Sequence, residues 1–360
     1  MGAEHTKRRK TVLAELAGRK LDCLLVTHPA NWYYLTGFTG ESGALVVSQD
    51  GATLLTDGRF TVQAKEETSG VKIELQQGGL YPALVAFLRK KGFGRFGYDA
   101  NQLAVTQWNT LRKGLGSKAR GVEATGLVER LRMLKDAQEL AVMRKAAILA
   151  GEIVQFAIGL LKPGIRESEV AAEIEYQMRK RGASGPAFET IVAFGERAAL
   201  PHARPTGKRL RKNELVVLDL GVILAHYCSD ITRTVFVGRA PERIRTWYKA
   251  VLEAETAAIA AVKSGAACGD VDAAARQVLA GYRLDRLFVH STGHGLGLEV
   301  HEGPRVARGQ KRLLEPGNVI TIEPGVYSEG IGGIRIEDDV AVHADRAEVL
   351  TRAPRDLIEI

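Results

Sequence analysis

Cysteine is scarce in this sequence: Cys23, Cys228 and Cys268 are the only three, and they lie far apart. An odd number at such spacing argues against a disulfide framework, and the absence of a C-x-x-C pair argues against a thiolate metal site. We therefore expect all three to be reduced packing residues of a cytoplasmic protein.

Long apolar runs are missing as well. No stretch of about 18 uncharged apolar residues occurs, so no membrane span is expected. The basic segment at 5–10 leads into a helix-like run rather than into the apolar core of a signal peptide. The formal net charge of +8 comes from scattered basic residues, which predict a solvated surface rather than a stripe that binds nucleic acid.

What remains is the composition of an ordinary globular protein. The 360 residues are 45% hydrophobic and 26% charged, which predicts two domains with a large core. In the first domain, residues 1–125, β-rich runs alternate with helical patterns and predict an α/β fold. Strands are expected at 21–27, 44–48 and 52–56, a turn-rich loop at 31–43, and helices at 61–68 and 82–91.

Gly92, Gly94 and Gly97 form a literal G-x-G-x-x-G in this domain. A dinucleotide-binding loop needs a strand before that motif and a helix after it. Here a helical run precedes the motif and a strand-like run follows it, so we expect a glycine-rich turn without a nucleotide.

The most informative stretch spans residues 214–237. Its apolar run at 215–218 predicts a buried strand that Asp219 closes, and a turn at Gly221 leads back through Asp230 into a β-branched run. Such a hairpin would bring the two aspartates to neighbouring positions on one face. Two carboxylates in an apolar setting repel each other and lose hydration, so they need a cation or a shared proton. A metal site is the natural interpretation.

A second copy of this pattern follows later in the chain. Residues 318–325 repeat the first strand, and residues 333–342 repeat the return strand. Glu323 and Glu337 then stand where the first copy has its two aspartates. The second domain, 130–360, therefore contains two related halves, 137–239 and 242–345.

Helices complete each half. Asp136 is predicted to cap a long helix that runs to Leu161, with Glu139 as its capping-box partner. Shorter amphipathic helices are expected at 167–181 in the first half and at 270–279 in the second.

Histidines gather in the second domain. Five of the eight lie there outside its final strand: His202, His226, His290, His294 and His301. A lone histidine is more often structural, and His226 is interpreted as a turn residue, but the last three lie within twelve residues and favour a functional cluster. With four acids already placed, one imidazole would complete an oxygen-rich dinuclear site that suits Mn²⁺, or Co²⁺ and Zn²⁺ as substitutes.

Five ordered segments resemble the M24 "pita-bread" metallopeptidases, in the branch of Xaa-Pro aminopeptidases and Xaa-Pro dipeptidases (prolidases). They are ALPHARP at 199–205, LDLGVILAHYCSDITRT at 218–234, HSTGHGLGLEVHE at 290–302, TIEPGVY at 321–327 and GIRIEDD at 333–339. With two loops of the first domain, the similarity covers nearly the whole chain. It implies an α/β (α+β) protein with a creatinase-like N-terminal domain, a pita-bread domain with an internal two-fold repeat, and a homodimer.

The resemblance also implies roles for individual residues. The family's metal ligands fall on Asp219, Asp230, His294, Glu323 and Glu337. Its substrate-binding and transition-state residues fall on His202, His290, His301 and Arg335. In relatives Asp230 and Glu337 bridge two ions, and Arg335 lies behind the ligands. We therefore expect two divalent ions per subunit, Mn²⁺ in the first place and Co²⁺ or Zn²⁺ as alternatives.

The expected chemistry is hydrolysis of the bond before proline in dipeptides or at the N-terminus of short peptides. Two divalent ions would polarise the scissile carbonyl and lower the pKa of a shared water. The resemblance gives Glu323 the transfer of that water's proton to the leaving nitrogen, and gives His202 and His301 hydrogen bonds to the developing oxyanion. Because proline's nitrogen carries no N–H, a site that fits the ring's shape suits this substrate.

Alternatives stay open. A methionine-aminopeptidase-like activity is disfavoured by the long first domain and by the paired His290 and His294. A metal-free relative, either a creatinase-like C–N hydrolase or a non-catalytic interaction module, would lack the ligand set that is filled here. Glu196 and Arg197 stand where small polar residues are more usual, close to the expected substrate mouth. The sequence separates neither dipeptidase from aminopeptidase nor one preferred residue before proline from another.

Overall fold

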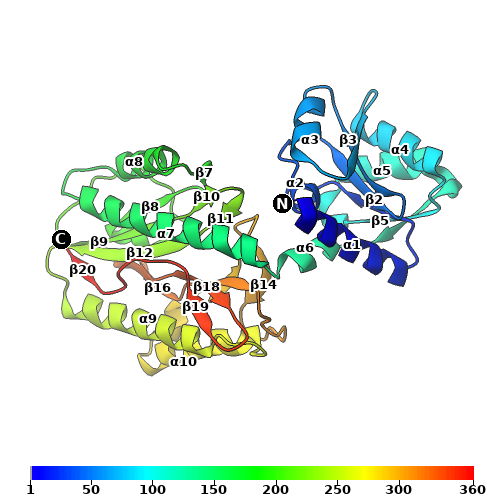
Figure 1. The fold of residues 1–360 in the computed structure, drawn as a ribbon. Coiled ribbons are helices and arrows are strands. Elements are labelled where there is room, and N and C mark those ends of the chain that lie inside the picture. The colour runs from blue at the N-terminus through cyan, green and yellow to red at the C-terminus, as the bar shows by residue number, and fades with distance from the viewer. Residues whose placement is uncertain (1) are drawn as a thin grey trace. The chain divides into compact units, whose positions relative to one another are not determined.

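The computed structural model describes residues 2–360, which form two compact units (Figure 1). The first unit ends at Arg132, and the second runs from Met133 to Ile360. Both combine helices with β-sheets, so the mixed α/β class predicted from the sequence is confirmed. Among the described residues, no helix is at once long and apolar enough to cross a bilayer.

One six-stranded sheet, in the order β4-β3-β2-β1-β5-β6, organises the first unit. Its strands are β1 (Cys23–Val26), β2 (Ala44–Ser48), β3 (Gly51–Thr56), β4 (Val71–Leu75), β5 (Arg95–Tyr98) and β6 (Arg120–Glu123). Strands β1 to β3 form an antiparallel meander, and β4, β5 and β6 join it in parallel. The three strands predicted for this unit are therefore confirmed.

Six helices accompany this sheet. They are α1 (Gly2–Gly18), α2 (Pro29–Thr36), α3 (Thr61–Glu67), α4 (Leu80–Lys91), α5 (Val105–Leu115) and α6 (Leu127–Arg132). Leu84 and Leu88 of α4 share a core cluster with Leu111 and Leu115 of α5 and with Phe96 of β5. The first unit thus has a hydrophobic core of its own.

The loop predicted at 31–43 is wrong in its first part, because Pro29–Thr36 form helix α2. Pro29 lies at the start of the helix, where its missing N–H removes no helical hydrogen bond, and Gly37 ends the helix in the left-handed region at φ 83°. Trp32 and Tyr34 of this short helix are buried. Burial therefore outweighed the turn-forming residues that dominate the sequence pattern.

The glycine-rich turn at 92–97 is confirmed. Gly92 ends α4 at φ 69°, and Gly97 lies within β5. The motif thus joins a helix to a strand, which is the reverse of the order that a dinucleotide-binding loop requires.

The second unit consists of two similar halves. Helices α7 (Ala137–Leu160) and α8 (Glu167–Lys180) accompany a sheet of order β20-β12-β9-β8. Helices α9 (Glu242–Ala261) and α10 (Cys268–Gly281) accompany a sheet of order β14-β13-β15-β18-β19. Figure 1 shows α7 and α8 on one side of the strands and α9 and α10 on the other.

The strands of the second unit fall into two series. In the first half they are β7 (Gly185–Pro186), β8 (Ile191–Phe194), β9 (Glu214–Leu220), β10 (Val222–Leu224), β11 (Tyr227–Cys228) and β12 (Ile231–Val237). In the second half they are β13 (Gly293–Gly295), β14 (Glu302–Val306), β15 (Val319–Ile322), β16 (Gly325–Ser328), β17 (Gly332–Arg335), β18 (Asp338–Val342) and β19 (Ala347–Val349), followed by β20 (Ile358–Glu359). The C-terminal β20 returns to the first half and pairs with β12.

The same insertion occurs in both halves. The antiparallel pair β9 and β12 encloses the short hairpin of β10 and β11, and the pair β15 and β18 encloses the hairpin of β16 and β17. This refines the simple hairpin expected at 214–237. Thr232 lies opposite Asp219 in the register, and Asp230 immediately precedes β12.

The predicted cap of α7 is confirmed. The Asp136 carboxylate accepts the backbone N–H of Glu139, and the Glu139 carboxylate accepts that of Asp136, both at 2.9 Å. The helix ends at Leu160, one residue before the predicted limit.

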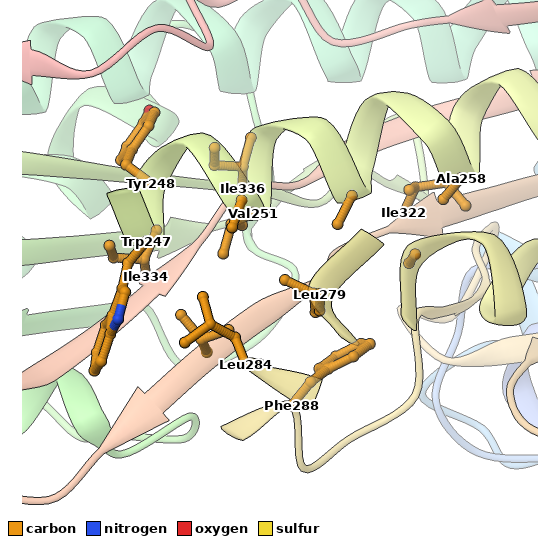
Figure 2. Packing of buried hydrophobic residues seen from close by; sticks show 14 of the residues in the cluster. Trp247, Tyr248, Val251, Ala258, Leu279, Leu284, Phe288, Ile322, Ile334 and Ile336 are labelled. Carbon is orange, nitrogen blue, oxygen red and sulfur yellow. The ribbon is translucent and has the colours of Figure 1, made fainter. Parts of the chain in front are cut away.

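A large apolar core stabilises the second half (Figure 2). Trp247 and Val251 of α9 pack with Ile334 and Ile336, while Phe288 packs near α10. Burial of each large side chain contributes about 1.5–3 kcal/mol. The core thereby holds β15, β17 and the segment around residue 336 in fixed positions.

A bidentate ion pair connects the first helix of the second unit to its late strand β19. Arg144 of α7 donates to both Glu348 oxygens at 2.7 and 2.8 Å, and His343 lies 2.7 Å from one of them. Chiefly through the Arg144 hydrogen bond, the pKa of Glu348 falls from 4.5 to about 2.

Glu348→Gln tests this contact. Because the folded-state pKa lies below the unfolded value, the carboxylate's stabilisation is complete above about pH 4.5 and is lost as the pH falls towards 2. Urea unfolding should show the variant less stable by about 1 kcal/mol at pH 7, since the guanidinium is partly exposed, and by progressively less between pH 4.5 and 3. A difference that stays constant with pH would contradict the assignment.

Candidate active site

All nine site residues predicted from the sequence line one cavity of about 590 Å³ in the second unit. They are His202, Asp219, Asp230, His290, His294, His301, Glu323, Arg335 and Glu337. Both halves contribute to it. In the first half, Asp219 lies in β9 and Asp230 immediately precedes β12. In the second half, His294 lies in β13, Glu323 follows β15 and Glu337 precedes β18. The volume is in the range of small-ligand sites.

Three potential ligands lie closest together. One atom each of Asp230, His294 and Glu337 lies within 4.8 Å of the others. His294 Nε2 is also 3.5 Å from Glu323 Oε1 and 3.8 Å from Asp230 Oδ2. These atoms are close enough to share a cation.

Burial and mutual repulsion both disfavour the charged form of these acids. Burial, and then the neighbouring acids with Glu337 first among them, raise the pKa of Asp230 well above its ordinary value. The pKa of Glu337 rises in the same way, and burial raises that of Glu323 to about 8 and also raises that of Asp219. The cavity wall therefore concentrates negative charge at a high electrostatic cost.

The donor atoms fit a divalent cation. His294 Nδ1 is 3.0 Å from the carbonyl oxygen of Gly295, which can only accept, so Nδ1 carries the proton and Nε2 presents a lone pair to the carboxylates. Burial lowers the pKa of His294 to about 4, which keeps it neutral. Asp219 Oδ1 is buried without a hydrogen-bond partner in residues 2–360. Electron pairs thus converge where a bound cation or a shared proton would stabilise them.

Glycines let β13 enter between its neighbours. A Cβ on Gly293 would lie 1.8 Å from the carbonyl oxygen of Thr321, and one on Gly295 would lie 1.9 Å from that of Gly303. No other residue fits this spacing. The glycines therefore allow β13 to lie close to the backbone of the neighbouring segments. This arrangement places His294 beside Glu323.

Arg335 supports the acids from behind. Its buried guanidinium donates to Asp219 Oδ2 at 2.5 Å, to Thr232 Oγ1 at 3.0 Å and to Tyr327 Oη at 2.7 Å. The Thr232 hydroxyl in turn donates to Glu337 at 2.6 Å. Sequence reasoning missed Thr232 and Tyr327, although both lie inside the segments that resemble the family.

The three expected substrate histidines have different surroundings. His290 is engaged by the protein, because Nδ1 donates to the carbonyl of Ser291 and Nε2 accepts from Tyr327 Oη, both at 2.8 Å. Burial lowers the pKa of His290 to about 4. His202 and His301 are exposed to the cavity, and within residues 2–360 neither forms a hydrogen bond.

Comparison with known proteins decides the family. Residues 141–344 match metallopeptidase family M24, and residues 8–134 match the creatinase/prolidase N-terminal domain. The chain belongs to metallopeptidase family M24. It is therefore a peptidase whose family depends on divalent metal ions, and the expected creatinase-like and pita-bread domains are confirmed.

Similar proteins cover nearly the whole chain. A Xaa-Pro dipeptidase of Pyrococcus furiosus is 37% identical over 94% of this chain and 95% of its own length. The solved Xaa-Pro dipeptidase from Bacillus anthracis has a TM-score of 0.94 at 34% identity, with all of both chains covered. An X-Pro aminopeptidase from Thermotoga maritima has a TM-score of 0.90 at 32% identity, covering 98% of this chain and 100% of its own.

Thr232→Val tests the support that Thr232 gives to the candidate metal ligands. The variant keeps the side-chain shape but loses the donor to Glu337 and the acceptor for Arg335, so affinity for Mn²⁺ should fall about 10- to 100-fold. Calorimetric titration of metal-stripped protein measures this. Thr234→Val is the matched control, since this buried neighbour in β12 bonds only to the main chain of Arg335. Equal losses in both variants would refute a specific role for Thr232.

Proposed function

We propose that this M24 peptidase uses two divalent metal ions to hydrolyse the Xaa-Pro bond of dipeptides or of the N-terminus of short peptides. The main support is the convergence of four carboxylates and one imidazole on the wall of one cavity. Further support comes from the Xaa-Pro dipeptidases of Pyrococcus furiosus and Bacillus anthracis, which are similar over 94% and 100% of this chain.

The proposed metal ligands are Asp219, Asp230, His294, Glu323 and Glu337. The family resemblance would have Asp230 and Glu337 hold both ions, and the two residues belong to the same close cluster with His294. An oxygen-rich set with one nitrogen suits Mn²⁺, with Co²⁺ or Zn²⁺ as substitutes. When bound, such ions polarise the scissile carbonyl and lower the pKa of the attacking water.

Glu323 is the proposed proton carrier. Its backbone N–H donates to the carbonyl of Thr292 at 2.7 Å, and the Thr321 hydroxyl lies 3.4 Å from its carboxylate, so its position at the wall is defined. Burial raises the pKa of Glu323 to about 8 while no cation is bound, and the family resemblance gives this group the proton transfer. It would accept the proton of the water and deliver it to the leaving nitrogen.

His202 and His301 are the proposed donors to the developing oxyanion. Both imidazoles lie in the cavity without hydrogen-bond partners among the described residues, so their N–H groups are available to substrate. Both ring nitrogens of His290 already form hydrogen bonds within the protein, to Ser291 and to Tyr327. We therefore propose that His290 contributes to substrate binding by shaping the cavity wall together with Tyr327.

The cavity also favours the dipeptide over longer substrates. Phe188, Ile191 and Val300 supply apolar lining, and Arg305 supplies an exposed guanidinium. Within residues 2–360 no ion pair engages Arg305. A cation at the wall of a small cavity suits the free α-carboxylate of the proline residue in an Xaa-Pro dipeptide.

The metal-free alternatives are less compatible with this site. A creatinase-like C–N hydrolase or an interaction module would have to keep four mutually repelling acids in the cavity wall without a compensating role. The proposed homodimer and cytoplasmic location rest on the family resemblance and the cysteine content, and no nucleic acid or membrane partner is proposed.

Peptide hydrolysis tests the proposed function. Metal-stripped protein supplied with Mn²⁺, Co²⁺ or Zn²⁺ should hydrolyse Xaa-Pro dipeptides, and should do so faster than Xaa-Pro-Yaa tripeptides. Liquid chromatography of released proline measures both, with Met-Ala peptides and chelator-treated protein as controls. Preferred cleavage of Met-Ala, or equal activity with excess chelator, would refute the proposal.

Asp230→Asn tests the metal site itself. Loss of one shared carboxylate should reduce hydrolysis to background and lower the metal retained after dialysis, measured by elemental analysis. Asp345→Asn is the control, because Asp345 is a surface aspartate with a side chain that is 75% exposed. Full activity in the Asp230 variant would contradict its assignment as a ligand.

A further inference from the structure

The loop at 194–206, which we call the His202 loop, brings a functional side chain to the cavity. Pro201, His202, Ala203 and Arg204 of this loop all line the cavity. Because the His202 imidazole forms no hydrogen bond within residues 2–360, the hydrogen bonds that fix its position are those of the surrounding loop. Whatever holds the loop therefore holds the histidine.

Glu167 holds both ends of this loop together. It lies at the start of α8 and is fully buried. Its carboxylate accepts the backbone N–H of Phe194 at 2.9 Å at one end of the loop. At the other end it accepts the backbone N–H and the hydroxyl of Thr206 at 2.9 and 2.6 Å. One buried anion thus closes the loop at its base.

Arg197 extends this contact towards the residues that follow the histidine. Its Nε lies 3.1 Å from each oxygen of Glu167, and its Nη2 donates to the carbonyl of Arg204 at 2.6 Å. The guanidinium therefore connects the base of the loop to a residue two positions after His202. The unusual arginine before the Ala-Leu-Pro-His segment has a structural partner.

The second half repeats this construction with different residues. In α10 the buried Asp272 accepts the backbone N–H and the hydroxyl of Thr292 at 3.2 and 2.8 Å, and pairs with Arg276 at 2.7 Å. Arg276 donates to the carbonyls of Phe288 and His290 at 3.2 and 2.5 Å. Figure 2 shows Phe288 lying close to Leu279 of α10. The 288–292 stretch, which we call the His290 segment, is thus held at three points.

We propose that the pairs Glu167–Arg197 and Asp272–Arg276 are positioning residues, which fix His202 and His290 respectively at the cavity without touching substrate. The inference rests on the proposed function, since it requires both histidines to contribute to peptide hydrolysis. Its physical basis is that a displacement of about 1 Å in a reacting group can lower the rate by up to 100-fold.

Two arginine variants form a crossed test. Arg197→Gln and Arg276→Gln each remove one charged donor and leave the buried carboxylate with its other hydrogen bonds, and each variant serves as the control for the other. Hydrogen–deuterium exchange should accelerate at 194–206 only in the first variant and at 288–292 only in the second. This measurement needs neither metal nor activity.

A double-mutant cycle on Xaa-Pro hydrolysis completes the test. Arg197→Gln should lower kcat about tenfold and leave KM within about twofold, because the interaction lost is one that His202 makes in the transition state. In a His202→Ala background, Arg197→Gln should lower kcat by less than about twofold, because the histidine it positions is already absent. Arg276→Gln should keep its full effect on kcat in that background. It should lose this effect in a His290→Ala background.

The possible outcomes separate the two proposals. The positioning role of Arg197 would be overturned if Arg197→Gln lowered kcat as much in the His202→Ala background as in the wild type. Unchanged hydrogen–deuterium exchange at 194–206 would overturn it as well. Local acceleration of exchange in a protein that hydrolyses no Xaa-Pro peptide would support the loop contacts while refuting the proposed function. Partial recovery of kcat in Arg197→Lys, which keeps one charged donor, would support positioning by the guanidinium.

Discussion

Repulsion among four acids in one cavity wall is the constraint on which the second unit depends. Asp219, Asp230, Glu323 and Glu337 line one cavity, and burial raises the pKa of each. Neighbouring acids raise the pKa values of Asp230, Glu323 and Glu337 further. The positive charge of Arg335 offsets part of the negative charge of the acids. Neutral His294 does not offset it, and its Nε2 lone pair is one more electron-pair donor facing the same space. The fold tolerates this cost because the arrangement suits divalent cations.

The four acids come from two similar halves of the second unit. Each half supplies an antiparallel strand pair interrupted by a short hairpin, β9 and β12 in the first and β15 and β18 in the second. Each half also has a second helix with a buried carboxylate, Glu167 in α8 and Asp272 in α10, which binds the main chain next to a cavity histidine. The proposed metal ligands and the proposed substrate-facing groups thus come from the same repeated unit.

Sequence reasoning succeeded where local chemistry dominates. The capping box of α7, the strands of the first sheet and the turn at Gly92 follow from residue type and spacing. It failed at 31–36, where burial of Trp32 made a helix out of a turn-rich pattern. It also did not foresee that Thr232 lies opposite Asp219, because the insertion at β10 and β11 changes the register.

The amino-acid sequence by itself determined which donor atoms are available, since two acidic strand pairs and one histidine cluster can be recognised from residue types in order. Only the tertiary structure decided which of these atoms meet. It also decided that Arg335 donates to Asp219, that Tyr327 donates to His290, and that Arg197 donates to the carbonyl of Arg204 within the His202 loop. The physical reason is that hydrogen-bond partners and desolvation depend on contacts between residues such as Thr232 and Glu337, which lie far apart in the chain and are brought together only by folding.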